Sequence, residues 1–201
     1  MRSGRYFIIS FLIILSVSGC EKSIDGLFFE ADQFQSKKEY VKATEVYTQI
    51  LKRNSKIQKA FFDRGMCFLR MREYSKAISD FNSIIILRGG DGMEFHLNED
   101  IPFASEEAHY QIGKTQAIKN RGIAYFFSDS LDLAYADMNR AVKSNFELGN
   151  SLIWQGNIAY KKNEVETACN LFEKARQLNY PEADSFLLKY CNSTKLINKP
   201  L

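Results

Sequence analysis

Apolar residues between positions 58 and 87 recur at helical spacing in two blocks, which are separated by a polar break at Arg72 and Glu73. A glycine-rich run follows the second block, and glycine tolerates the left-handed conformation that commonly ends a helix. The pattern predicts two antiparallel helices joined by a short turn. The small residues Gly65 and Ala77 would let these helices approach closely, because neither side chain stands in the way.

The same pattern of small and large apolar positions occurs four times along the chain. Units one and two are offset by 34 residues (24 to 58), and so are units three and four (115 to 149). Units two and three are further apart because an insertion spans about 92–114. The positions that stay small in all four units are Ala31, Gly65, Gly122 and Gly156 in the first helix and Ala43, Ala77, Ala134 and Ala168 in the second.

A 34-residue helix–turn–helix with this pattern resembles the tetratricopeptide repeat. The resemblance implies an all-α fold, a right-handed superhelical array of about four helix hairpins over residues 24–193. A last helix at 184–192 would cap the array, and residues 194–201 would form a frayed tail. The sequence departs from the family pattern at Ala31, where glycine is usual, and at Pro181, which falls one place late.

The insertion reads differently in its two halves. The first half is irregular, with glycine, Pro102 and an acidic bias. The second half predicts a helix from about Ser105, which either runs into the first helix of unit three or kinks at Gly113. An insertion of this length can be a binding element or a solvated loop, and the sequence leaves both open.

Residues 1–19 are predicted to be a secretory leader. Arg2 and Arg5 form a positive start, and the apolar stretch at 6–17 is shorter than the roughly 20 residues that span a bilayer. The leader ends in Val17-Ser18-Gly19-Cys20, which resembles the bacterial lipobox. That resemblance implies acylation of Cys20 and cleavage before it. The alternative is an ordinary signal peptide with an incidental cysteine.

If Cys20 is lipidated, residues 20–23 form the anchored N-terminus and the first repeat lies close to the membrane. Glu21 follows the cysteine, and the enterobacterial sorting rule retains lipoproteins with aspartate at this place. We therefore expect a lipid-anchored protein of the bacterial cell envelope, with the outer membrane facing the periplasm favoured.

Charge and motifs give little support for other classes of function. The formal net charge is +3, so no strong electrostatic case exists for nucleic-acid binding. No phosphate-cradling glycine loop or nucleophile elbow is present, so we predict no catalytic residue and no cofactor. His96 and His109 match no metal-ligand spacing, and solvated side chains are favoured over a metal site.

The remaining cysteines differ in their sequence context. Cys67 lies between apolar residues of a first helix and is predicted to be a small core residue. Cys169 and Cys191 lie on helices that should pack side by side, so a disulfide between them is possible outside the cytoplasm. Two separate free thiols are the alternative.

The tetratricopeptide resemblance also implies that the first helices line a concave groove that binds a partner. The chaperone-binding class of these repeats uses Lys and Asn to clamp a terminal carboxylate, and Phe28 and Asp32 stand at those places here. The implied groove is unusually apolar, so either a peptide or helix or the folded-back insertion would cover it. The residues that we predict to line the groove are Phe28, Phe62, Met66, Leu69, Lys119, Phe126, Asn157 and Tyr160.

The leading hypothesis is thus a lipid-anchored scaffold that binds another envelope protein or peptide through its groove. The alternative is an envelope enzyme or solute-binding accessory that uses the histidines and acidic residues of the insertion.

Overall fold

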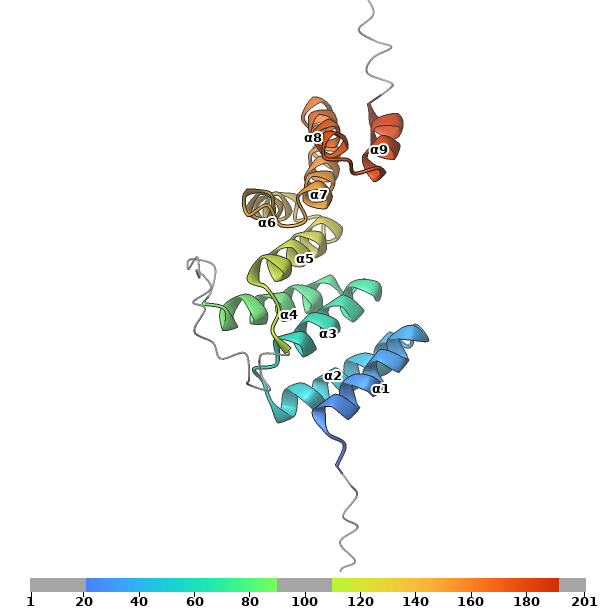
Figure 1. Ribbon diagram of the computed structural model, residues 1–201, viewed down its shortest axis with the longest axis vertical. Helices are drawn as coiled ribbons and strands as arrows, with labels where there is room; N and C mark the ends of the chain where they lie inside the picture. The colour runs from blue at the N-terminus through green and yellow to red at the C-terminus, as the bar shows by residue number, and fades with distance from the viewer. Residues whose placement is uncertain (1–20, 90–109, 192–201) are drawn as a thin grey trace, which may run out of the picture.

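The computed structural model describes residues 21–89 and 110–191. The leader, Cys20, both histidines, most of the insertion and the tail lie outside these ranges, so the predictions made for them stay predictions. Within the described ranges the chain is all-helical. Its helices are α1 (Ile24–Ser36), α2 (Tyr40–Arg53), α3 (Gln58–Arg70), α4 (Tyr74–Leu87), α5 (Lys114–Phe127), α6 (Leu131–Lys143), α7 (Leu148–Lys161), α8 (Val165–Gln177) and α9 (Glu182–Tyr190) (Figure 1).

The helices form a right-handed superhelical array of four hairpins, as the sequence predicts. Each helix packs on the next along the chain, and α9 packs on α8 as a cap. Figure 1 shows α1 and α2 at one end of the long axis and α9 at the other. No helix in the described ranges is both long and apolar enough to cross a membrane.

Every hairpin turns in the same way, although none of the turns uses glycine. The second residue after each first helix has a positive φ: 60° at Lys38, 61° at Arg72, 64° at Asp129 and 64° at Asn163. The backbone N–H two places after the helix cap then donates to the carbonyl five residues earlier, as from Glu73 to Phe68 at 2.8 Å. This hydrogen bond satisfies a carbonyl that the helix end leaves without a partner.

Within three hairpins the helices cross where a glycine faces a large apolar side chain. A Cβ atom placed on Gly65 would lie 3.0 Å from the Phe81 ring, and one on Gly156 would lie 2.5 Å from the Phe172 ring. Both rings are completely buried. The predicted small positions therefore have a steric cause, because the partner ring occupies the space of the missing side chain.

Neighbouring hairpins are joined by a buried polar contact that the sequence analysis missed. The Arg64 guanidinium donates to both carboxylate oxygens of Asp80 at 2.9 and 2.7 Å, and its third nitrogen donates to Thr48 of the preceding hairpin at 2.9 Å. One unit later, Arg121 binds Asp137 in the same way, with both distances 2.8 Å, and donates to Asn82 at 2.6 Å. The signal in the sequence is an Arg and an Asp 16 residues apart at the same phase of units two and three.

The described end of the insertion is not α-helical. Tyr110 is in a 3₁₀ conformation, residues 111–113 have no regular secondary structure, and α5 begins at Lys114 with Gly113 as its N-cap (φ −61°, ψ 136°). The prediction of a helix that runs unbroken into unit three is therefore wrong. Contacts with α3 and α4 hold this segment in place, as described below.

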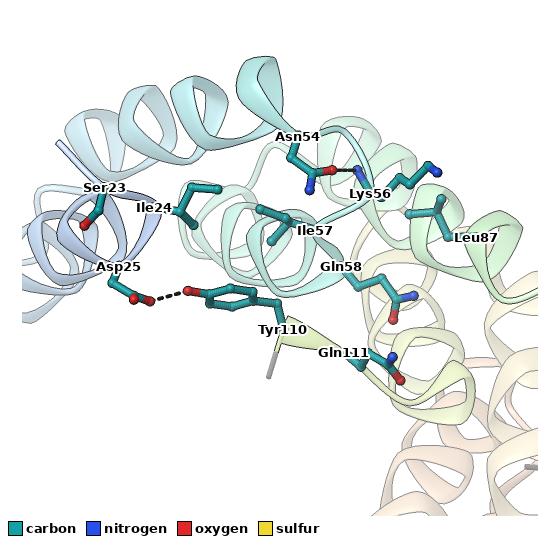
Figure 2. A pocket seen from close by; sticks show the side chains of 10 residues that line it. All are labelled: Ser23, Ile24, Asp25, Asn54, Lys56, Ile57, Gln58, Leu87, Tyr110 and Gln111. Carbon is teal, nitrogen blue, oxygen red and sulfur yellow. Dashed lines mark hydrogen bonds between the residues drawn. The ribbon is translucent and has the colours of Figure 1, made fainter. Parts of the chain in front are cut away.

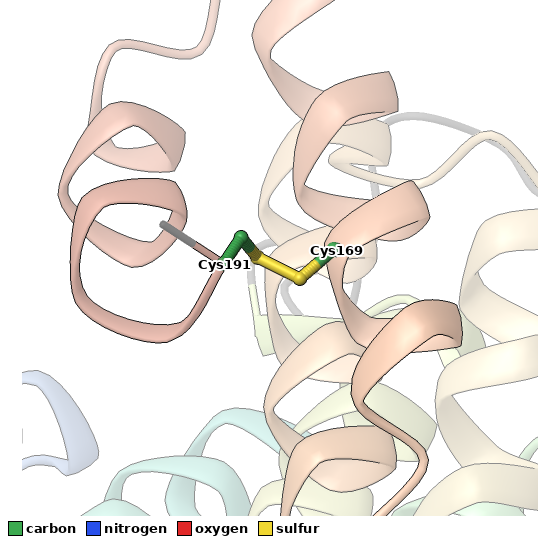
Figure 3. Close-up of a disulfide and its surroundings, with 2 residues drawn as sticks. All are labelled: Cys169 and Cys191. Atoms are coloured by element: carbon green, nitrogen blue, oxygen red, sulfur yellow. A yellow bond between two sulfur atoms is a disulfide. The ribbon is translucent and has the colours of Figure 1, made fainter. Parts of the chain in front are cut away.

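A disulfide joins Cys169 on α8 to Cys191, directly after α9, with Cα atoms 5.8 Å apart (Figure 3). The bond fixes the end of the capping helix to the last hairpin. Cys67 is a free, buried thiol, as predicted for a core residue.

We expect Gly156→Ala to lower the free energy of unfolding by about 1–3 kcal/mol, because the added methyl overlaps the buried Phe172 ring. Alanine alone would favour the helix over glycine by about 1 kcal/mol, so a loss would report the steric effect. Gly113→Ala is the control, since a Cβ there meets no atom within 4 Å. Equal urea-denaturation midpoints for both variants would contradict the proposed crossing.

Candidate partner-binding face

The face predicted to bind a partner is the concave side of the array, formed by α1, α3, α5 and α7. The structure divides it into an N-terminal half on α1 and α3 and a C-terminal half on α5 and α7. These halves differ in how far their side chains are already occupied by contacts within the chain.

Tyr110 covers the N-terminal half. Its ring stacks on Phe28 with centroids 5.0 Å apart and planes 14° apart, and its hydroxyl donates to Asp25 (Figure 2). The Lys59 ammonium also lies over the Phe28 ring, 4.8 Å from its centroid. Phe28 is therefore only 6% exposed. Thus the end of the insertion covers this predicted groove residue.

Hydrogen bonds to α3 and α4 hold the Tyr110 segment in place. The backbone N–H of Ile112 donates to the Gln58 side-chain oxygen at 3.0 Å. Arg88, just after α4, donates to the same oxygen at 3.0 Å, to the Ile112 carbonyl at 3.2 Å and to Gln111 at 3.0 Å. This end of the insertion thus lies on the first helices in the way that a bound peptide would.

A cavity of about 390 Å³ lies beside Tyr110, between the start of α1, the α2–α3 turn and the end of α4 (Figure 2). Its apolar wall consists of Ile24, Ile57, Leu87 and the Tyr110 ring, and polar side chains surround that wall. The size falls within the range of about 300–1,000 Å³ that is usual for ligand pockets.

A group of titratable side chains lies between α1, α2 and α3, and two of its members, Tyr47 and Cys67, stay uncharged. Tyr47 donates to Asp32 at 3.2 Å, and Lys59 pairs with Asp63 at 2.5 Å. Burial raises the pKa of Asp63 even though Lys59 acts in the opposite direction. Burial, with the nearby carboxylates of Asp63 and Asp32, raises the pKa of Tyr47 and raises that of the Cys67 thiol to about 12.

Tyr47 and Cys67 are therefore protonated at neutral pH, and neither is activated as a nucleophile. No group of three or more His, Cys, Asp or Glu residues in the described ranges could hold a metal ion.

Lys119 is buried rather than available to a partner. Its ammonium forms an ion pair with Glu147 and donates to Asn150 at 3.0 Å, and the residue is 7% exposed. Both partners lie at the start of α7, so Lys119 ties α5 to the next first helix. Lys119 and Phe28 are therefore two predicted groove residues that contacts within the chain already occupy.

The predicted residues of α3 are half-buried. Phe62, Met66 and Leu69 pack against the core shared by units two and three, and Phe62 also lies 5.9 Å from the Phe81 ring.

The C-terminal half carries an aromatic cluster of Phe126, Phe127 and Trp154, and Tyr74 at the start of α4 packs beside it. Phe127 is exposed, whereas the other three side chains are half-buried. Phe127 stacks on Tyr74 with centroids 5.7 Å apart, and Trp154 meets both phenylalanines edge-on at 5.6 and 5.9 Å. Phe127 is 48% exposed.

Tyr160 lies farther along α7 and is 37% exposed, although its ring centroid is 4.0 Å from that of Tyr190 on the cap. Asn157, one turn earlier, is half-buried. The Lys161 ammonium lies 4.9 Å from the Phe126 ring centroid and 2.8 Å from Asp129. Phe126 and Asn157 are thus half-buried on α5 and α7, and Tyr160 of α7 is the most exposed of these predicted residues.

The sequence analysis missed Phe127 and Trp154, which are among the larger side chains of this surface. Phe127 directly follows the predicted groove residue Phe126, and Trp154 lies one helical turn before the predicted groove residue Asn157. Their aromatic character next to those positions is the signal that could have identified them.

We expect Tyr110→Ala to expose Phe28 and to accelerate amide hydrogen exchange in α1, because the stacked ring is lost. An aromatic pair of this kind typically contributes about 0.5–1.5 kcal/mol. Tyr110→Phe is the matched control, since it keeps the stack and loses only the hydrogen bond to Asp25. Unchanged exchange in α1 of the alanine variant would show that Tyr110 does not cover this half.

No protein-family model matches the sequence, and no curated protein matches it. Solved structures do match the fold. A MamA fragment (41-end) from Desulfovibrio magneticus RS-1 is 18% identical, with a TM-score of 0.62 over 78% of this chain and 76% of that chain. YrrB, described as a TPR protein with an unusual peptide-binding site, is 15% identical, with a TM-score of 0.57 over 82% and 73%.

A third similar structure is the first TPR of Spaghetti (RPAP3) bound to the HSP90 peptide SRMEEVD. It is 20% identical, with a TM-score of 0.51 over 70% of this chain and 93% of that chain. Identities this low carry information on the fold alone. The three structures show that this chain has the tetratricopeptide-repeat fold.

Proposed function

We propose that this protein is a scaffold that holds a protein or peptide partner on the C-terminal half of its concave face, and that a lipid on Cys20 anchors it in the cell envelope. The observation that carries the binding proposal is the exposure of two aromatic side chains on the first helices, Phe127 and Tyr160, with the half-buried Phe126 and Trp154 in contact with Phe127. Large exposed aromatic residues are typical of protein-binding surfaces.

The solved structures support the same class of function. Among proteins of this fold, YrrB is described as having a peptide-binding site and the RPAP3 repeat is bound to a peptide. In this chain Phe28 stands where a carboxylate-clamping repeat has lysine, and the buried Lys119 is already paired with Glu147. A partner would therefore contribute apolar or aromatic side chains rather than a terminal carboxylate.

The anchoring proposal rests on the sequence from Val17 to Cys20 behind a positively charged, apolar leader. The Cys169–Cys191 disulfide supports a location outside the cytoplasm, where such bonds persist. Glu21 after the cysteine favours the outer membrane, with the protein facing the periplasm.

The cavity beside Tyr110 has the size of a ligand pocket, but the described ranges contain no group of His, Cys, Asp or Glu residues that could hold a metal ion there. The end of the insertion that is described contributes Tyr110 and Ile112, and these residues contact the protein's own helices. The histidines that motivated the alternative lie outside the described residues. We therefore assign no reaction to this chain.

Replacing Phe127 and Tyr160 together by serine should abolish retention of the partner, because interface anchors of this kind cost about 2 kcal/mol or more each when they are truncated. The measurement is co-purification from detergent-solubilised envelope, with helical content followed by circular dichroism. The matched control replaces Leu133 on α6 and Leu178 directly after α8 by serine, which are 53% and 47% exposed. Loss of the partner in both double variants, or in neither, would contradict the assignment of the face.

Cys20→Ser should stop the incorporation of labelled fatty acid and prevent lipoprotein-type cleavage of the leader. The wild-type protein should carry the label and partition into the detergent phase. A wild-type protein that takes up no label and stays in the aqueous phase would exclude the anchor, but it would leave the partner-binding face untouched.

A further inference from the structure

We propose that the edge of units one and two formed by their free helix ends is a membrane-contact surface, which lies on the anionic lipid headgroups around the anchor. This edge consists of the start of α1, the end of α2, the α2–α3 turn and the end of α4. The inference rests on the proposed acylation of Cys20, and it adds which surface of the fold faces the bilayer.

The length of the tether is the first argument. Only Glu21, Lys22 and Ser23 separate Cys20 from α1. Three extended residues reach about 10 Å at most. A lipid on Cys20 therefore holds the start of α1 within that distance of the headgroups.

The tether is also fixed in direction. Arg53, the last residue of α2, forms an ion pair with Glu21 at 2.8 Å and donates a hydrogen bond to the Lys22 carbonyl. Ser23 then caps α1 by accepting a hydrogen bond from the Gly26 N–H at 3.1 Å. The chain is thus held against the free ends of α1 and α2, so this edge, and not the edge with the hairpin turns, faces the anchor.

The chemistry of the edge fits a lipid surface. Ile86, near the end of α4, is 70% exposed, and Leu87 beside it is 40% exposed. Leu87 also lines the cavity that Ile24 and Ile57 share (Figure 2). Apolar side chains at a membrane surface can enter the boundary between headgroups and acyl chains.

Basic residues surround these apolar side chains. Lys22, Lys52, Arg53, Lys56 and Arg88 lie at this edge. Its acidic residues within the described ranges are Glu21, Asp25 and Glu30, and Glu30 forms an ion pair with Lys22 at 3.1 Å. Lys52 and Lys56 are exposed and have no ion-pair partner within the described ranges. Lysines near an anionic leaflet are attracted to it, and this attraction acts within a Debye length of the surface.

The opposite edge carries the features of the partner-binding face. Phe126 and Phe127 end α5, Tyr160 lies near the end of α7, and Tyr74 begins α4, so all four lie where hairpins turn. With the free-end edge on the membrane, these aromatic residues would point away from it. A partner could then reach them without competing with lipid.

The test compares a polarity-sensitive thiol label at Ile86→Cys with the same label at Val41→Cys in the lipidated chain. Val41 is 61% exposed at the start of α2, near basic residues, and α2 places it about 20 Å from the free-end edge. The pair is thus matched in exposure and in local charge. Cys67 is buried and Cys169 is bonded to Cys191, so neither competes for the label.

The labelled proteins are reconstituted in vesicles of phosphatidylethanolamine and phosphatidylglycerol, with a nitroxide on the lipid headgroup as quencher. We expect severalfold stronger quenching at position 86 than at position 41, and weaker quenching at 86 when a neutral lipid replaces phosphatidylglycerol. Equal quenching at the two positions would overturn the proposal. Loss of the quenching at position 86 when an acidic protein is added in solution would overturn it as well.

The proposal of an acyl anchor and the proposal of a membrane-contact surface can be disproved independently of each other. Acylation is read by fatty-acid labelling, independently of the quenching. If the wild-type chain is not acylated, the leader and Cys20 are replaced by a histidine tag that binds a nickel-chelating lipid in the same vesicles, which tethers the protein at the same place. Stronger quenching at 86 in that chain keeps the surface and loses the acyl anchor, whereas equal quenching in that chain removes the surface as well.

Discussion

The fold depends on one steric condition, which is that the first helix carries only glycine or alanine where the second helix crosses it. Gly65, Gly122 and Gly156 meet this condition, and Phe81, Met138 and Phe172 fill the space. Because each crossing is set by the same pair of positions, hairpins of the same shape are produced and can stack in an array. The concave face, its two halves and the free-end edge all follow from that stacking.

Stacking requires a second interaction, since apolar packing alone does not fix the orientation of one hairpin relative to the next. Arg64 and Arg121 provide it, because each binds a carboxylate of its own hairpin and a hydroxyl or amide of the preceding one. Buried ion pairs are weak evidence for stability, and their best-attested role is to specify one arrangement over others. The terminal units lack the pair, with Glu30 and Gln155 at the position of the arginine.

The helix hairpins could be predicted from the sequence because their signals are local and are repeated four times. The conformation of the turns was harder to predict from the sequence, because the residues with positive φ are not glycine. They are Lys38, Arg72, Asp129 and Asn163. The site was predictable only in part. Tyr110 and Asp25 are 85 residues apart, and no local pattern indicates that the end of the insertion covers Phe28. The burial of Lys119 likewise depends on Glu147, which lies in the next unit.

The central claim is that a partner occupies the open aromatic half of the concave face. The most direct measurement places a photoreactive phenylalanine analogue at position 127 or at position 133 and irradiates intact cells. Phe127 and Leu133 are similarly exposed, at 48% and 53%, but only Phe127 lies on a first helix. The account predicts one cross-linked product of defined mass from position 127 and none from position 133. The same product from both positions, or a product from position 133 alone, would contradict it.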